Sequence, residues 1–291
     1  MAFAATTVFA QDLTSKKGEP ILPEADDWSI GVDATPFLNY AGNLFNGNSF
    51  NNAPTWNFLN TNQTIIGKMF MDEKTAYRAI LRIGFQSTKE VAMIADATVT
   101  TPPTYPNLPS MKEDTWKHSQ RFIGLGGGIE MRRGKTRLQG FYGGDFMFWM
   151  SGSKDVYEYG NALSASGTVV TPNPGTTTSF NGGANMTFDT YGNAARVTEY
   201  KSGSTIGFGV RGFIGAEYFI LPKISVGAEF GWGFGITTTG ADSETVESVG
   251  GTGPSVGTQT VEGGKASSMM LDVDRNAFGT GNGSLRMNFH F

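Results

Sequence analysis

Hydrophobic and polar residues alternate along the last eight residues of the chain, 284–291. The apolar positions are Leu285, Met287, Phe289 and Phe291, and the polar positions between them are Arg286, Asn288 and His290. Because successive side chains of a strand point to opposite faces, this pattern predicts a strand with one apolar and one polar face. Such a strand suits either the wall of a transmembrane barrel or the edge of a half-buried soluble sheet, so the upstream segments must decide.

The same alternation recurs upstream and predicts about eight strands, each near the ~9–11 residues that a tilted membrane crossing needs. The predicted strands are 28–40, 61–71, 76–87, 120–132, 136–149, 204–219, 223–236 and 283–291. Their connections alternate between short turns at 72–75, 133–134 and 220–222 and long polar loops at about 41–60, 88–119, 150–203 and 237–282. This asymmetry is typical of outer-membrane barrels, which have periplasmic turns and extracellular loops. An even strand number then places both termini in the periplasm.

The two faces of these segments separate apolar from charged residues. One face is free of charge and carries residues such as Ile65, Leu81, Leu125, Phe146 and Phe234. The charged residues of the opposite face are Asp33, Lys68, Arg78, Arg82, Glu130, Arg132, Arg137, Asp145, Arg211, Glu217, Glu229 and Arg286. A soluble protein would need a second sheet to cover the apolar face, and no strands remain to form one. The sequence therefore predicts an all-β fold, an antiparallel up-and-down transmembrane β-barrel of about eight strands with long extracellular loops.

The start of the chain is apolar, and Val8-Phe9-Ala10 has the small residues at the two positions that a signal peptidase reads. We expect residues 1–10 to be a residual signal peptide, 11–27 a periplasmic N-terminal segment and 28–291 the barrel. No basic residue precedes the apolar run, so the natural start is expected upstream of Met1. The chain has no cysteine, which excludes disulfides and thiolate metal sites. Its net charge of −4 and scattered basic residues do not predict nucleic acid as a partner.

A barrel of about eight strands has an interior that side chains can fill. The predicted turn at Arg133-Gly134 puts Glu130 opposite Arg137, and the predicted turn at 220–222 puts Phe213 opposite Glu229, with Arg211 one diagonal step away. An unpaired ion in a low-dielectric interior costs several kcal/mol, so each acid needs a partner. We therefore favour structural ion pairs that plug the barrel over a proton or ion pathway.

The chain resembles the small eight-stranded outer-membrane barrels typified by OmpX and the OmpA transmembrane domain, with loops and a Ser-Leu-Arg-Met-Asn-Phe-His-Phe ending like those of Bacteroidota surface barrels. The resemblance implies that Leu285, Met287, Phe289 and Phe291 form the C-terminal insertion signal read by the barrel-assembly machinery. It also implies outer-membrane lipid and lipopolysaccharide as surroundings and a possible protein partner at the extracellular loops. Family members serve as adhesins, structural supports, lipid-modifying enzymes or subunits of larger complexes, and fold analogy does not choose among these roles.

Catalytic and ligand-binding motifs match poorly. His118 and Ser119 are neighbours on one strand, so they face opposite sides and do not suit a nucleophile and its base. Residues 272–276 begin like a calcium loop, but Ala277 replaces the turn-forming glycine. The glycines of 124–128 lie within a predicted strand and do not form a phosphate loop. We expect no catalytic residue, metal or cofactor, and a non-catalytic surface barrel that serves in adhesion, interaction or an outer-membrane complex. The alternatives are a narrow channel or small-solute transporter and a lipid-modifying rim enzyme.

Overall fold

The computed structural model describes residues 13–47, 64–101, 103–165, 176–177, 179–180, 183–252, 255–273 and 284–291. Within this part of the chain, thirteen strands join in one antiparallel sheet, and a further two-stranded sheet is formed by β6 (Ser179–Phe180) and β7 (Gly183–Ala184). The prediction of an all-β antiparallel fold is confirmed. The expected signal peptide, 1–10, lies outside the described residues.

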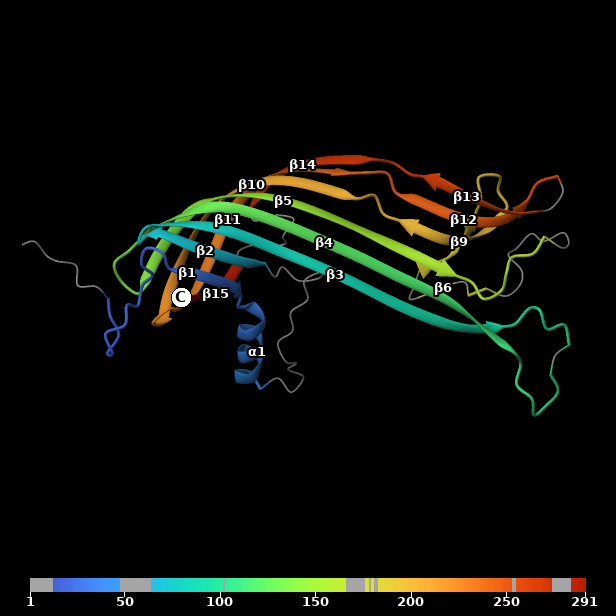
Figure 1. Ribbon diagram of the computed structural model, residues 1–291, viewed down its shortest axis with the longest axis horizontal. Helices are drawn as coiled ribbons and strands as arrows, with labels where there is room; N and C mark the ends of the chain where they lie inside the picture. Colours follow the sequence, from blue (N-terminus) through green and yellow to red (C-terminus); the bar gives the residue numbers. More distant parts are fainter. Residues whose placement is uncertain are drawn as a thin grey trace, which may run out of the picture.

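Eight strands of the large sheet pair one after another into a closed ring, at the left of Figure 1. In ring order they are β1 (Trp28–Asp33), β2 (Ile65–Asp72), β3 (Thr75–Ala95), β4 (Met111–Arg133), β5 (Leu138–Glu158), β10 (Thr205–Leu221), β11 (Ile224–Thr239) and β15 (Ser284–His290). The C-terminal strand closes the ring by pairing with β1, with Ile30 opposite Phe289. Closure satisfies backbone groups that an open sheet would leave unpaired at its edges.

The predicted first strand, 28–40, is only partly correct. β1 ends at Asp33, and the helix α1 (Thr35–Phe45) follows and contacts β15. A proline lies in the first turn of α1, where its missing N–H group costs no hydrogen bond. Apolar residues at 37, 38, 41, 44 and 45 fit helical spacing as well as they fit a strand, and a short apolar run does not distinguish the two.

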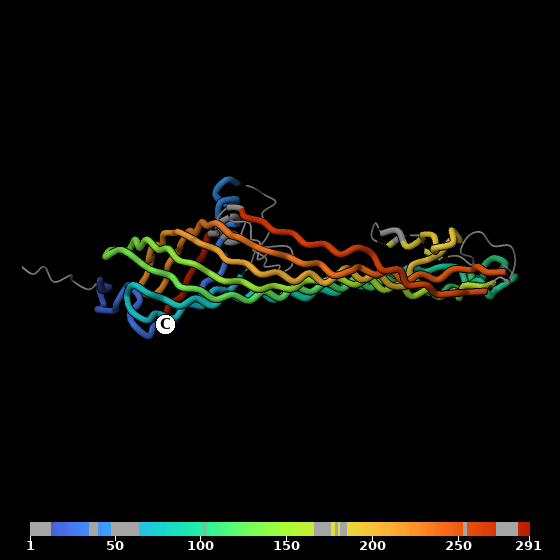
Figure 2. Tube along the Cα trace, turned by 90° about the horizontal axis from the view of Figure 1, so that it is seen from above, coloured from blue at the N-terminus to red at the C-terminus, as the bar shows by residue number. Residues whose placement is uncertain are grey.

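Three strands of the ring continue far beyond it. β3, β4 and β5 have 21, 23 and 21 residues, which at ~3.3 Å per residue makes each about 70 Å long. β9 (Ala194–Lys201), β12 (Ser243–Gly250) and β13 (Ser255–Glu262) extend the sheet beside them, and β14 (Ala266–Val273) pairs with the upper part of β11. Residues 86–95, 111–120 and 151–158 with β9, β12 and β13 form what we call the distal sheet. It is long and curved in Figure 1 and thin in Figure 2.

The regions expected to be long loops therefore contain much strand. The segment after β5 also folds onto the far end of the distal sheet, where β8 (Met186–Phe188) pairs with β9. Buried Arg196 binds Glu247 at 2.5 Å and donates to the backbone oxygen of Asn161 at 2.9 Å. Buried Asp114 accepts from the backbone N–H groups of Gly160 and Thr177 at 2.9 and 2.8 Å. Side-chain contacts of this kind give the tip a defined structure.

Candidate functional site

The inner and outer faces of the ring have opposite chemistry. Apolar side chains point outward and are exposed, for example Leu125 at 48%, Phe146 at 53% and Trp232 at 53%. The buried charged residues of the inner face are Lys68, Arg78, Arg82, Glu130, Arg132, Asp145, Arg211, Glu217, Glu229 and Arg286. Soluble proteins bury apolar side chains, and they almost never fully bury charged ones unless these are paired. The ring has the reverse arrangement, with apolar side chains outside and charged ones inside, and this is its most informative feature.

Near the turns of the ring, ion pairs and a hydrogen bond connect four strands. Glu130 of β4 contacts Lys68 Nζ of β2 at 2.8 Å and Arg132 of its own strand at 3.0 Å. Arg132 also binds Glu217 of β10 at 2.5 Å. Glu217 accepts a further hydrogen bond from the Asn288 amide of β15 at 2.6 Å. This part of the interior therefore joins strands that are distant in sequence and on different sides of the ring.

A second group of ion pairs lies further along the strands and connects to the first. Arg78 of β3 contacts Glu229 of β11 at 2.9 Å, and Arg211 of β10 binds the same carboxylate at 2.5 Å. Arg78 also reaches Asp145 of β5 and Glu130, each at 3.4 Å. Arg78 thus links carboxylates from three strands, and the two groups form one network.

Aromatic rings support the buried cations. The guanidinium of Arg78 lies 3.9 Å from the ring centre of Phe213, and that of Arg82 lies 4.4 Å from Phe122. Lys68 Nζ lies 5.1 Å from the ring centre of Phe141. The quadrupole of an aromatic ring attracts a cation over its face, most strongly where water is excluded. These rings therefore compensate part of the hydration that the cations lose.

Glycine makes room for the charged side chains in the interior. A Cβ atom at position 128 would overlap the Asp145 carboxylate, and one at position 231 would come within 2.9 Å of Arg211 Nε. Small residues at such positions allow long side chains from neighbouring strands to cross the lumen. This explains part of the chain's unusual content of 40 glycines in 291 residues.

Two predicted cross-strand pairs are wrong in register. Residues 134–137 form the connection between β4 and β5, so Glu130 lies opposite Gly143 and not Arg137. Arg137 lies outside the network and donates to the backbone oxygens of Phe219 and Ile220, at 3.3 and 3.0 Å. The turn is longer here than expected and shifts the register, because turn length and turn type set the pairing of a hairpin.

The hairpin between β10 and β11 also differs from the prediction. Its turn is Pro222-Lys223, and a β-bulge between Phe219 and Leu221 shifts the register, so that Gly215 lies opposite Glu229. The expected neighbourhood of Arg211 and Glu229 is nevertheless correct, as their ion pair shows. Arg211 lies four residues from Gly215, two steps along the same face instead of the one expected, and its long side chain still reaches Glu229.

The remaining predicted residues have these positions. Asp33 lies directly opposite Arg286 in the β1–β15 register, and Arg286 donates to the Thr64 backbone oxygen at 3.1 Å. The alternation in β15 is as predicted, because Leu285, Met287 and Phe289 are half-buried, the polar residues between them are buried and Phe291 is exposed. Three residues that were not among the predicted site residues also contact Glu217 or one another: Asn288, His290 and Ser225. Their positions on the polar face were a usable signal.

A small void lies beside the charge network. A void of about 10 Å³ is lined by Lys68, Arg78, Phe141, Glu229, Arg286 and their neighbours. This volume is about the minimum that one water molecule needs. The charged residues hold one another instead of lining an open pore at this level.

His118 is the one candidate for acid–base chemistry that the sequence places near the rim. Its Nδ1 lies 2.8 Å from an Asp155 carboxylate oxygen that also accepts a hydrogen bond from the Trp116 indole at 2.8 Å. Ser119 is the next residue of β4 and faces the opposite side of the sheet. Among the residues that the structure describes, no group of three or more histidine and acidic side chains could hold a metal ion.

Comparison with known proteins finds no matching family model, no matching curated protein and no matching solved structure. In the described part of the chain, no helix is both long and apolar enough to cross a bilayer. The features that bear on function are the chemistry of the two faces and the distal sheet.

Proposed function

We propose that the ring is a transmembrane β-barrel of the bacterial outer membrane and that its charge network is a structural plug. The distal sheet then projects from the cell surface, where it contacts a partner by adhesion or within an outer-membrane complex, without catalysis. The turns between β2 and β3 and between β10 and β11, and both termini, face the periplasm. Outer-membrane lipid and lipopolysaccharide surround the barrel.

The observation that carries this proposal is the exposed apolar band around a charged interior. On β10 the outward side chains from Ile206 to Ile220 include six large apolar residues that are 43–58% exposed. The band covers about 46 Å of strand, which at a tilt of about 45° corresponds to a height of about 33 Å. A bilayer has a hydrocarbon core of about 30 Å, so the band has the height that lipid requires.

The same observations weigh against the channel alternative. An ion or solute pathway needs a continuous polar opening, whereas the network joins opposite walls of the ring through ion pairs of 2.5–3.4 Å. The rim-enzyme alternative has weaker support still, because His118 and Ser119 lie on opposite faces of β4. A structural plug requires only the pairing of charges that is observed.

Single-cysteine labelling tests the proposed topology, because the chain has no cysteine of its own. Val256→Cys is exposed on β13, and Glu73→Cys is exposed in the turn between β2 and β3. In intact Gram-negative cells, a membrane-impermeant maleimide should label Val256→Cys and should label Glu73→Cys only after the outer membrane is permeabilised.

Leu125→Cys, in the apolar band, is the matched control and should stay unlabelled until the protein is unfolded. Each variant is first checked for folding by comparing its mobility in SDS gels before and after boiling. A closed barrel stays folded in SDS until it is heated, so the mobility of a folded variant changes on boiling. Equal labelling of Val256→Cys and Glu73→Cys in intact cells would contradict the proposed orientation.

A further inference from the structure

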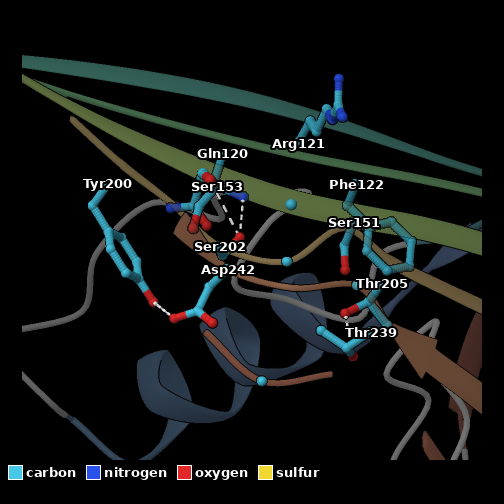
Figure 3. Close-up of a pocket in the computed structure, with 14 residues that line it drawn as sticks. Gln120, Arg121, Phe122, Ser151, Ser153, Tyr200, Ser202, Thr205, Thr239 and Asp242 are labelled. Atoms are coloured by element: carbon cyan, nitrogen blue, oxygen red, sulfur yellow. Dashed lines mark hydrogen bonds between the residues drawn. The ribbon is translucent and has the colours of Figure 1, made fainter. Parts of the chain in front are cut away.

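A polar hollow of about 500 Å³ lies where the ring opens into the distal sheet (Figure 3). Its lining combines aromatic, hydroxyl, amide and carboxylate side chains from five strands and their connections. The principal residues are Gln120, Phe122, Ser153, Tyr200, Thr205 and Asp242. Its volume lies within the ~300–1,000 Å³ of small-molecule sites.

The hollow is formed by a specific local structure. At 202–204 the chain leaves β9 before entering β10, and the Ser153 backbone N–H donates to Ser202 Oγ at 2.7 Å. A second interruption of strand structure, at 240–242, separates β11 from β12. The Gly240 backbone N–H donates to the Ser204 backbone oxygen at 3.0 Å and joins the two interruptions. A side chain at Gly203 would overlap the Gly240 carbonyl, so the two interruptions fit together only with glycine there.

The charge of the lining favours a neutral ligand. The Tyr200 hydroxyl donates to Asp242 at 3.3 Å and holds this carboxylate at the hollow. Arg121 is one of the residues that line the hollow, but its side chain points away from the other labelled side chains in Figure 3, in agreement with its position on the opposite face of β4. The hollow therefore presents a carboxylate without a facing arginine, which disfavours phosphorylated or acidic ligands.

The same chemistry continues from the hollow toward the tip. Along β4 and β5, cross-strand neighbours on this face are Gln120 with Ser153, His118 with Asp155, and Trp116 with Tyr157. Successive rows are about 7 Å apart, so the three rows span about 14 Å. Half-buried Phe122 and Trp116 lie at the two ends of this path on β4, and half-buried Gln120 and His118 between them carry hydrogen-bonding groups.

We propose that the hollow and these three rows bind a neutral oligosaccharide in an extended conformation. Sugar hydroxyls both donate and accept, which matches the serine, threonine and glutamine side chains, and the apolar faces of sugar rings pack on aromatic rings. The inference rests on the proposed display of the distal sheet for its biological role, but binding by purified protein is measured independently of cysteine labelling.

The test fills the hollow instead of removing its contacts. Gly264 lines the hollow, and a Cβ atom there would have no neighbour within 4 Å, so Gly264→Phe adds a ring without backbone strain. Gly257→Phe is the matched control, because its Cβ would also be unobstructed and Gly257 is not among the residues lining the hollow. The purified full chain in detergent is titrated by calorimetry with maltohexaose, a neutral hexamer of N-acetylglucosamine and an acidic hexamer of galacturonate.

We expect at least one neutral hexamer to bind, Gly264→Phe to weaken its binding about tenfold or more, and Gly257→Phe to change it by less than about twofold. Tyr200→Phe keeps the ring but releases Asp242, and should weaken binding by about threefold or more. Failure of both neutral hexamers to bind the parent overturns the proposal, and so does tighter binding of the acidic hexamer. Unchanged binding by Gly264→Phe places the ligand elsewhere and also overturns it. If the cysteine variants are labelled as expected but no sugar binds, the proposed barrel and its orientation remain supported and only the proposed sugar binding is refuted.

Discussion

Replacing Glu130 by glutamine tests whether the interior is a dry, paired plug. The side chain is fully buried and contacts Lys68 at 2.8 Å, Arg132 at 3.0 Å and Arg78 at 3.4 Å. Glu130→Gln keeps the volume but removes the negative charge. Arg132 retains Glu217, and Arg78 retains its other carboxylates, but Lys68 keeps no carboxylate among the described residues within 4.0 Å.

The expected cost follows from the ammonium left buried at Lys68. Breaking a buried pair by removing one partner costs about 3–5 kcal/mol. With a denaturant slope of about 3 kcal/mol per molar urea, the unfolding midpoint should fall by about 1–1.7 M. Leu125→Ala, on the lipid-facing side, should cost only about 0.5 kcal/mol, the scale of the insertion free energy of one leucine.

The assay is urea unfolding of the protein in phospholipid vesicles, followed by the heat-sensitive mobility of the folded band. A Glu130→Gln variant that also carries Lys68→Met should recover much of the lost free energy of unfolding, because the unpaired charge is then gone. If Glu130→Gln unfolds at the parental urea concentration, the interior is hydrated and the reasoning about a plug is refuted. A steady single-channel conductance from the parent would lead to the same conclusion and favour the channel.

Two further predictions concern the end of the chain and the tip. Deleting Phe291 should lower the amount of protein inserted in the outer membrane, because its aromatic side chain and its paired backbone hydrogen bonds with Trp28 help to close the ring. Phe291→Tyr should insert normally, and parental levels of the deletion would contradict the proposed insertion signal. Burial favours neutral Asp189, but hydrogen bonds from Asn193 and Ser248 outweigh it and lower the pKa of Asp189 to about 2. The stabilisation is therefore present above the usual pKa of 3.8 and lost as pH falls through about 2. The protection factors of amides 189–193, which correct for the intrinsic pH dependence of exchange, should fall at low pH in the parent and not in Asp189→Asn.

The alternation of apolar and polar residues by itself determined the strands and their two faces. The sequence alone assigns the charged residues to the polar face of the strands, among them Lys68, Glu130, Arg211 and Glu229. Their partners need not be known, because the side chains of a strand alternate with a period of two whatever lies beside it. The eight ring strands follow from the same periodicity. Residues 35–40 were predicted as the end of a strand but belong to α1, because a short apolar run fits both a strand and a helix.

Only the tertiary structure decided which charges meet and where the strands end. Turn geometry leaves Arg137 outside the charge network and places Gly143, not Arg137, opposite Glu130. The alternation of apolar and polar residues carries no information about turn geometry. How far the strands extend past the apolar band was not determined by the sequence. The distal segments are mostly polar, with one small apolar cluster at Ala195, Val197 and Val246, and they are stabilised by pairing with distant strands. The hollow at Tyr200 and Asp242 exists only because two chain interruptions, at 202–204 and 240–242, lie side by side, and this kind of non-local contact leaves no periodic signal in the sequence.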